Sequence, residues 1–118
     1  MKKILIIDDE PHIIKMVKSR LEANGYEVVT AFNGKEGLDK MHQENPDLII
    51  VDILMPIMDG YTFVRELKKE EKEIPVIVLT ANTGMTDLFD GEGVTDHIYK
   101  PFKTEELLEK IRKHIGED

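Results

Sequence analysis

Three short aliphatic runs, each followed by a polar residue, constrain the fold of this chain more than any other feature. They span Lys3 to Ile7, Leu48 to Val51 and Val76 to Leu79, and most of their residues are isoleucine, leucine or valine. Runs this short, apolar and β-branched are typical of strands buried on both faces of a parallel sheet. Two weaker runs, Glu27 to Ala31 and Thr95 to Tyr99, are expected at or near the sheet edges.

Helical patterns fill the gaps between the runs, and several have recognisable start or stop signals. The signals are Pro11 at a first helical position, Gly25 as a left-handed stop, Asn33 with Glu36 as a capping box, and Asp59 and Thr104 as N-caps. This alternation predicts a doubly wound α/β fold, a five-stranded parallel sheet with helices on both faces. We expect a single domain over residues 1–118, because this length suits one core.

The stretch between Thr80 and Thr95 gives the weakest helical signal. It contains three glycines, Gly84, Gly91 and Gly93. Glycine costs about 1 kcal/mol relative to alanine in a helix interior. We therefore expect any helix here to be short or mobile, with weak protection of residues 84–94 in hydrogen exchange.

The charge balance narrows the classes of partner. The chain has 24 acidic and 16 basic residues, a formal net charge of −8, which argues against nucleic-acid binding through a broad basic surface. It has no cysteine, which excludes thiol chemistry, thiolate metal sites and disulfides. The aliphatic run Ile4 to Ile7 is too short for a signal peptide or a membrane helix, so we expect a cytoplasmic location and no membrane partner.

Polar residues stand where four of the five expected strands end. Asp8 and Asp9 follow the first strand, Asp52 the third, Thr80 the fourth and Lys100 the fifth. Doubly wound folds bind ligands beyond the carboxyl ends of their parallel strands, so we expect these side chains to converge. Carboxylates without histidine or cysteine partners suit Mg²⁺. A cation, a lysine and a hydroxyl together suit a phosphoryl group, with one carboxylate as the nucleophile.

Each of these residues also has a structural interpretation when it is taken alone. Asp8 and Asp9 could cap the next helix, Thr80 is a common strand residue, and Lys100 could be an ordinary surface lysine. Asp52 is harder to explain in this way, because a carboxylate on a central strand is costly without a partner. The functional interpretation therefore depends on the joint pattern of polar groups at these four strand ends.

Four motifs together resemble the receiver domain of bacterial two-component response regulators, and the resemblance covers essentially the whole chain. They are Ile6 to Glu10 (IIDDE), Asp52 to Gly60 (DILMPIMDG), Leu79 to Ala81 (LTA) and Lys100 to Phe102 (KPF). The resemblance implies a flavodoxin-like sheet with strand order 2-1-3-4-5. It also implies a phosphorylation-activated switch, here expected to be of the stand-alone, single-domain type.

The resemblance further implies a metal site and a phosphorylation site. Asp52 would accept a phosphoryl group from a phosphohistidine donor, in a reaction that the domain itself catalyses, as it would catalyse the later dephosphorylation. Asp9, Asp52 and the backbone carbonyl of Leu54 would hold Mg²⁺, or Mn²⁺ in its place. Asp8 would help to hold the cation through water.

The resemblance assigns the remaining roles to other strand ends and to partners. Thr80 and Lys100 would contact the phosphoryl group, and the bond between Lys100 and Pro101 would be cis. The donor would be a sensor histidine kinase or a histidine phosphotransfer protein, docked on the first helix near Ile13, Ile14 and Lys18. The switched domain would then bind a downstream protein target.

One residue departs from the family pattern. Receiver domains usually have tyrosine or phenylalanine three residues before the lysine, and this chain has His97 there. We expect Tyr99 to lie on the other side of the strand and not to take that place. His97 is then either a switch residue that makes the response pH-sensitive, since histidine changes charge near neutral pH, or an exposed edge-strand residue with no switch role.

Three alternatives remain open from the sequence. The chain could be an interaction module that is never phosphorylated, although such pseudo-receivers usually lose some of the acids, the threonine or the lysine. It could be the receiver fragment of a longer regulator. It could also be a dehalogenase-like phosphatase, but that class has an Asp-x-Asp pair where this chain has the adjacent acids Asp8 and Asp9, and it needs a cap domain for which this chain has no room.

Overall fold

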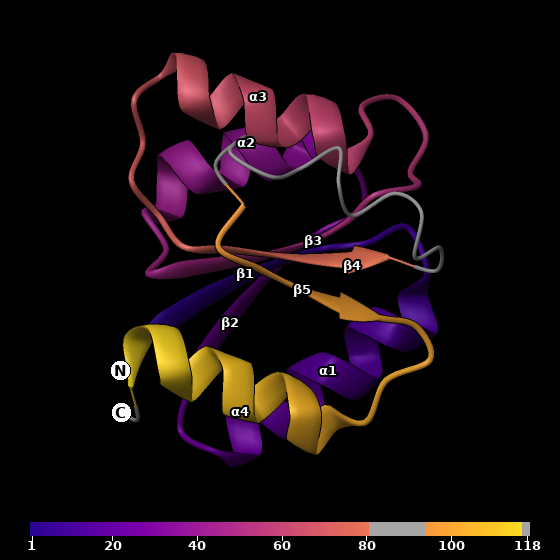
Figure 1. The fold of residues 1–118 in the computed structure, drawn as a ribbon, viewed down its shortest axis with the longest axis vertical. Helices are drawn as coiled ribbons and strands as arrows, with labels where there is room; N and C mark the ends of the chain where they lie inside the picture. The colour runs from indigo at the N-terminus through magenta and orange to yellow at the C-terminus, as the bar shows by residue number, and fades with distance from the viewer. Residues whose placement is uncertain (81–93, 117–118) are drawn as a thin grey trace.

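The structure, a computed structural model, describes residues 1–80 and 94–116. Its centre is a sheet of five parallel strands in the order β2-β1-β3-β4-β5 (Figure 1). The strands are β1 (Lys3–Ile7), β2 (Glu27–Ala31), β3 (Leu48–Asp52), β4 (Val76–Thr80) and β5 (Asp96–Tyr99). The strand order is the one that the receiver resemblance implied, and the two weaker strands, β2 and β5, form the edges as predicted.

Helices cover both faces of the sheet. Helices α1 (Pro11–Ala23) and α4 (Thr104–Ile115) lie on one face, and α2 (Gly34–Glu44) and α3 (Gly60–Lys69) lie on the other (Figure 1). The doubly wound α/β fold is therefore confirmed. None of the described helices is long and apolar enough to cross a membrane.

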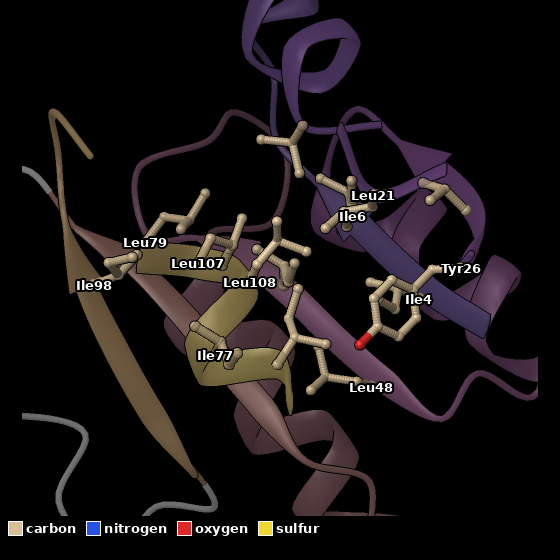
Figure 2. Packing of buried hydrophobic residues seen from close by; sticks show 14 of the residues in the cluster. Ile4, Ile6, Leu21, Tyr26, Leu48, Ile77, Leu79, Ile98, Leu107 and Leu108 are labelled. Carbon is tan, nitrogen blue, oxygen red and sulfur yellow. The ribbon is translucent and has the colours of Figure 1, made fainter. Parts of the chain in front are cut away.

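The two faces of the sheet bury separate cores, because successive side chains of a strand point to opposite faces. On β1, Ile4 and Ile6 pack toward α1 and α4 (Figure 2), whereas Leu5 and Ile7 pack toward α2 and α3. All residues of β3 and β4 are buried. This double burial explains why the central strands are apolar throughout, and it makes the polar groups at their ends conspicuous.

Most of the predicted helix signals are confirmed. Pro11 is the first residue of α1, and Gly25, just after its end, has a positive φ of 91°. The side chain of Asn33 accepts the backbone N–H of Glu36 at 2.8 Å, and that of Asp59 accepts the backbone N–H of Thr62 at 2.7 Å. These caps fix where α2 and α3 begin.

Two boundaries differ from the predictions. Thr104 is not an N-cap: Lys103 takes that position, without a side-chain cap, and Thr104 is already helical. Glu105 and Glu106 in the first turn complement the positive end of the helix dipole instead. The last strand begins at Asp96, one residue later than predicted. Most of the glycine-rich stretch, and with it the exchange prediction for residues 84–94, lies outside the described residues.

Candidate functional site

The strand ends bring the predicted polar residues together at one edge of the sheet. Asp8 directly follows β1, Asp52 and Thr80 end β3 and β4, and Lys100 directly follows β5. The exposed fraction is 0% for Asp8, 5% for Asp52 and 2% for Thr80. Three polar residues buried to this degree need partners in the protein or in a ligand.

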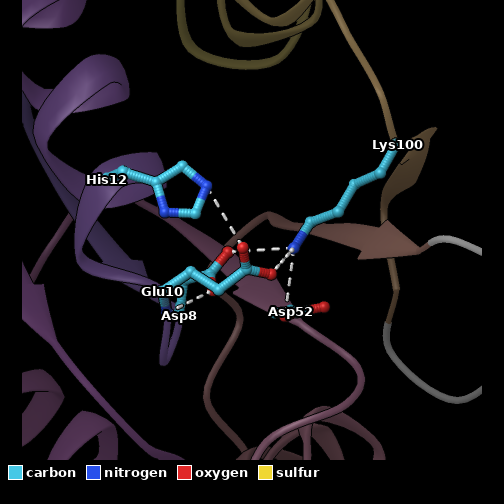
Figure 3. Close-up of polar contacts among 5 residues, drawn as sticks. All are labelled: Asp8, Glu10, His12, Asp52 and Lys100. Carbon is cyan, nitrogen blue, oxygen red and sulfur yellow. Dashed lines mark hydrogen bonds and ion pairs between the residues drawn. The ribbon is translucent and has the colours of Figure 1, made fainter.

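Lys100 supplies the positive charge of the site (Figure 3). Its Nζ lies 3.1 Å from Oδ2 of Asp52 and 3.3 Å from Oδ2 of Asp8, and its side chain is only 16% exposed. The other carboxylate oxygen of Asp8, Oδ1, accepts the backbone N–H of Glu10 at 3.0 Å. Asp8 therefore has both oxygens engaged, which makes it an orienting group for Lys100.

Four acids surround this single lysine. Asp8, Asp9, Glu10 and Asp52 each offer a carboxylate oxygen, and these oxygens all lie within 4.8 Å of one another. Glu10 belongs to the IIDDE motif, but no sequence pattern assigned it to the site. The signal that could have indicated it is the run of three consecutive acids after β1. One ammonium cannot neutralise four carboxylates, so the cluster favours an added cation.

The electrostatics of Asp52 reflect this imbalance. Burial, together with the negative charge of Asp8, raises the pKa of the Asp52 carboxyl from 3.8 to about 6, although Lys100 and a backbone hydrogen bond at Leu54 act in the opposite direction. Burial alone would lower the pKa of the Lys100 ammonium, but the charges of Asp52 and Asp8 outweigh it and raise that pKa. Asp52 is thus a carboxylate whose negative charge is poorly compensated by the protein.

A tight turn holds the loop that follows Asp52. The backbone N–H of Met58 donates to the carbonyl of Pro56 at 2.8 Å across Ile57, which has a positive φ of 71°. Such a turn is strained, above all for a β-branched residue. Gly60 then packs so closely on the backbone of Asp52 that a Cβ atom would collide with the Asp52 carbonyl oxygen. The loop is therefore fixed against the end of β3.

The remaining candidate residues lie around the same edge. The backbone N–H of Lys100 donates to the carbonyl of Thr80 at 2.8 Å, which joins the ends of β4 and β5. The bond between Lys100 and Pro101 is cis, as the receiver resemblance implied. The side chain of Leu54 is 69% exposed and points away from the core. Ala81, the last residue of the LTA motif, lies outside the described residues.

His97 and Tyr99 lie on the same side of β5. Both are exposed, and their rings meet edge to face with centroids 5.2 Å apart. The expectation that Tyr99 lies on the other side is wrong, because residues two positions apart in a strand share a face. The position where the family usually has an aromatic ring is therefore occupied by His97, whose ring packs against the neighbouring ring of Tyr99.

A groove of about 480 Å³ borders the acid cluster. It is lined by Glu10, Ile13, Met16, Lys100, Pro101 and Phe102. Ile13 thus faces the groove as the docking expectation requires, whereas Ile14 is buried in the core and is not available to a partner. The groove connects the first helix with the segment that carries Lys100.

Comparisons with known proteins place the chain among response regulators. The family model that describes the response regulator receiver domain matches residues 4–112. The protein described as "Probable transcriptional regulator ycf27" of Guillardia theta is 44% identical over 113 residues, which cover 94% of this chain and 44% of that protein. The regulator RpaA of Synechocystis is 40% identical over 95% of this chain and 48% of its own length.

Solved structures give the same result at the level of the fold. The chemotaxis protein CheY4 of Vibrio cholerae superposes with a TM-score of 0.91 at 35% identity, over 98% of this chain and 99% of that chain. The response regulator TrrA of Thermotoga maritima, solved in complex with Mg²⁺-BeF, has a TM-score of 0.90 at 38% identity, over 98% of this chain and 100% of that chain.

The fold and the acid pocket define a signalling receiver, and the chain belongs to the response regulator receiver domain family of two-component signal transduction. Membership excludes the dehalogenase-like phosphatase alternative, and it implies a histidine kinase as a partner. The chain spans about half the length of the curated relatives that it matches.

Proposed function

We propose that Asp52 is the phosphoryl acceptor of this receiver domain and that the reaction depends on a divalent cation. The observation that supports this most strongly is the position of Lys100, whose Nζ lies 3.1 Å from Asp52 in a pocket of four acids. Asp8 is fully buried with both oxygens engaged, whereas Asp52 keeps some exposure and has a raised pKa. Among the buried acids, Asp52 is therefore the one that a donor can reach.

The residues present fit Mg²⁺, with Mn²⁺ as a substitute. The donor set is made of carboxylate oxygens alone, which hard cations prefer. We assign Asp9, Asp52 and the backbone carbonyl of Leu54 as the ligands, with Asp8 linked to the cation through water. When bound, the cation would offset the charge of the acids and of the incoming phosphoryl oxygens.

The groups of the chain position the reaction. Ionised Asp52 attacks phosphorus with a carboxylate oxygen, and a new P–O bond forms. The bond between phosphorus and the donor's leaving group breaks, and the leaving group keeps its electron pair. Lys100 stays close enough to pair with a phosphoryl oxygen, and the hydroxyl of Thr80 lies on the neighbouring strand end. Placing a nucleophile and compensating charges in this way is what phosphoryl transfer needs from a protein.

The new phosphoryl group would act as a switch. It adds negative charge beside Thr80 and Lys100. A contact of either residue with the phosphoryl group would shift the conformational equilibrium at the ends of β4 and β5. His97 on β5 is the candidate readout, since it occupies the family's aromatic position, and its ring packs against that of Tyr99. The donor is a sensor histidine kinase or a histidine phosphotransfer protein that docks in the groove beside Ile13, and the output is the binding of a downstream protein target.

We further propose that residues 1–118 form one receiver domain that can switch without a second domain, because the family model and the fold of CheY4 each match this stretch. The half-length coverage of the curated regulators makes the receiver part of a longer regulator the competing proposal. The two are distinguished by the length of the natural transcript and the mass of the protein in its cell.

A small-molecule donor tests the proposed acceptor. The protein is incubated with acetyl phosphate in Mg²⁺ or in EDTA, and its intact mass is followed for the wild type and for Asp52→Asn. We expect one phosphoryl adduct in the wild type, only with Mg²⁺, and none in the variant. The absence of any adduct in the wild type would support the interaction module instead.

A further inference from the structure

Glu10 stands at the N-cap of α1, but its side chain does not cap the helix. It is the N-cap of α1, where its backbone carbonyl accepts the N–H groups of Ile13 and Ile14, but its carboxylate makes no cap hydrogen bond. Helices prefer serine, threonine, aspartate or asparagine there, because their short side chains can cap. The longer carboxylate of Glu10 turns instead toward the acceptor site.

The carboxylate of Glu10 lies between the side chains of Lys100 and His12 (Figure 3). Its Oε1 lies 3.6 Å from Nζ of Lys100, and its Oε2 lies 3.3 Å from Nε2 of His12, which is 75% exposed on the first turn of α1. Glu10 itself is 45% exposed and lines the groove that borders the site. It therefore stands at the boundary between the groove and the acids.

This position places a negative charge in the path of a donor. A carboxylate oxygen of Glu10 lies within 4.8 Å of one of Asp52, so a phosphoryl group that reaches Asp52 passes close to Glu10. Lys100 cannot compensate Glu10 fully, because its ammonium is closer to Asp52 and Asp8. The repulsion grows with the negative charge of the donor.

We propose that Glu10 is a specificity-determining residue of the acceptor site. It disfavours donors in proportion to their net negative charge, and so favours donors that bring a positive group beside the phosphoryl group. The inference rests on the proposed function, because it concerns the choice of donor for Asp52.

Two small donors with different charges test this property. Acetyl phosphate is a dianion near pH 7, and its transfer to the carboxylate releases acetate. Phosphoramidate is a monoanion with a positively charged nitrogen beside phosphorus, and its transfer releases neutral ammonia. In both cases a carboxylate–phosphorus bond forms, the bond to the leaving group breaks, and the leaving group keeps the electron pair.

The experiment compares the two donors in the wild type, in Glu10→Gln and in Glu22→Gln. Phosphorylation rates are measured at low ionic strength and at Mg²⁺ concentrations that saturate each protein, as determined by thermal shift. Glutamine keeps the shape of Glu10 and an acceptor oxygen, and its backbone still caps α1. Glu22 is an exposed acid at the far end of the same helix, so its variant controls for the loss of one charge.

We expect Glu10→Gln to raise the ratio of acetyl phosphate rate to phosphoramidate rate by about fourfold or more, the effect of one unit charge at about 5 Å in water. The Mg²⁺ dissociation constant from thermal shift rises as well, because a neighbouring negative charge is lost. Glu22→Gln leaves the ratio unchanged. An unchanged ratio in Glu10→Gln overturns the inference alone, whereas a wild type that reacts with neither donor overturns the proposed function.

Discussion

Neutralising Asp52 should stabilise the fold when no divalent cation is present. The pKa of Asp52 is raised from 3.8 to about 6, so the folded protein binds more protons than the unfolded chain between these values, and stability falls as pH rises through this window. At about 1.4 kcal/mol per pKa unit, the ionised carboxylate costs about 3 kcal/mol above pH 7 and about 1 kcal/mol near pH 4.5. Asp52→Asn removes this cost, because the amide carries no charge.

Urea unfolding followed by circular dichroism measures the effect. In EDTA, we expect Asp52→Asn to exceed the wild type in free energy of unfolding by about 3 kcal/mol near pH 7.5 and by about 1 kcal/mol near pH 4.5. Asp39→Asn, which removes the same charge from an exposed position of α2, should show neither gain nor pH dependence. Added Mg²⁺ should narrow the gap by stabilising the wild type. Equal stability of variant and wild type in EDTA at both pH values would refute the reasoning.

Three further predictions concern the loop after Asp52 and the strand β5. Ile57→Asn should raise the free energy of unfolding by about 1 kcal/mol, because asparagine tolerates a positive φ and the exposed isoleucine side chain loses little burial; a loss of stability in urea would contradict this. Asp96→Asn should lower it by about 2 kcal/mol at pH 7. Burial raises the pKa of Asp96, but hydrogen bonds from His114, the His97 backbone and Lys110 outweigh burial and lower that pKa from 3.8 to about 2. The stabilisation by ionised Asp96 is therefore present above pH 4 and is lost as pH falls toward 2. An equal loss of unfolding free energy in Asp96→Asn at both ends of this pH range would contradict the prediction. His97→Tyr should flatten the dependence of target affinity on pH between 5.5 and 8 in the phosphorylated protein, and parallel curves for variant and wild type would contradict a switch role.

The sheet and the polar cluster at its edge could be predicted because few other structures suit these residues. Runs such as Leu48 to Val51 have no polar face, so only a strand covered on both sides accommodates them. Once the strands were parallel, Asp8, Asp52, Thr80 and Lys100 had to share one edge. The convergence of these residues followed from topology, and it needed no knowledge of side-chain packing.

The errors arose where local chemistry decides between similar options. Thr104 is a good N-cap by residue type, but the helix begins one residue earlier because Lys103 adopts the extended conformation. Glu10 was missed because a third acid in a row resembles a solvated charge until its distances to Lys100 and Asp52 are known. The strained turn at Ile57 was also out of reach, since isoleucine is a residue type that argues against a positive φ.

The most direct test of the central claim is to locate the phosphoryl group on the chain. The protein is treated with acetyl phosphate and Mg²⁺, and borohydride then reduces an acyl phosphate to an alcohol, which converts an aspartyl phosphate to homoserine. Peptide mass spectrometry should find homoserine at position 52, only when Mg²⁺ was present, and at no other aspartate. Homoserine at Asp8 or Asp9, or an adduct that borohydride leaves intact on a histidine such as His12, would contradict Asp52 as the acceptor.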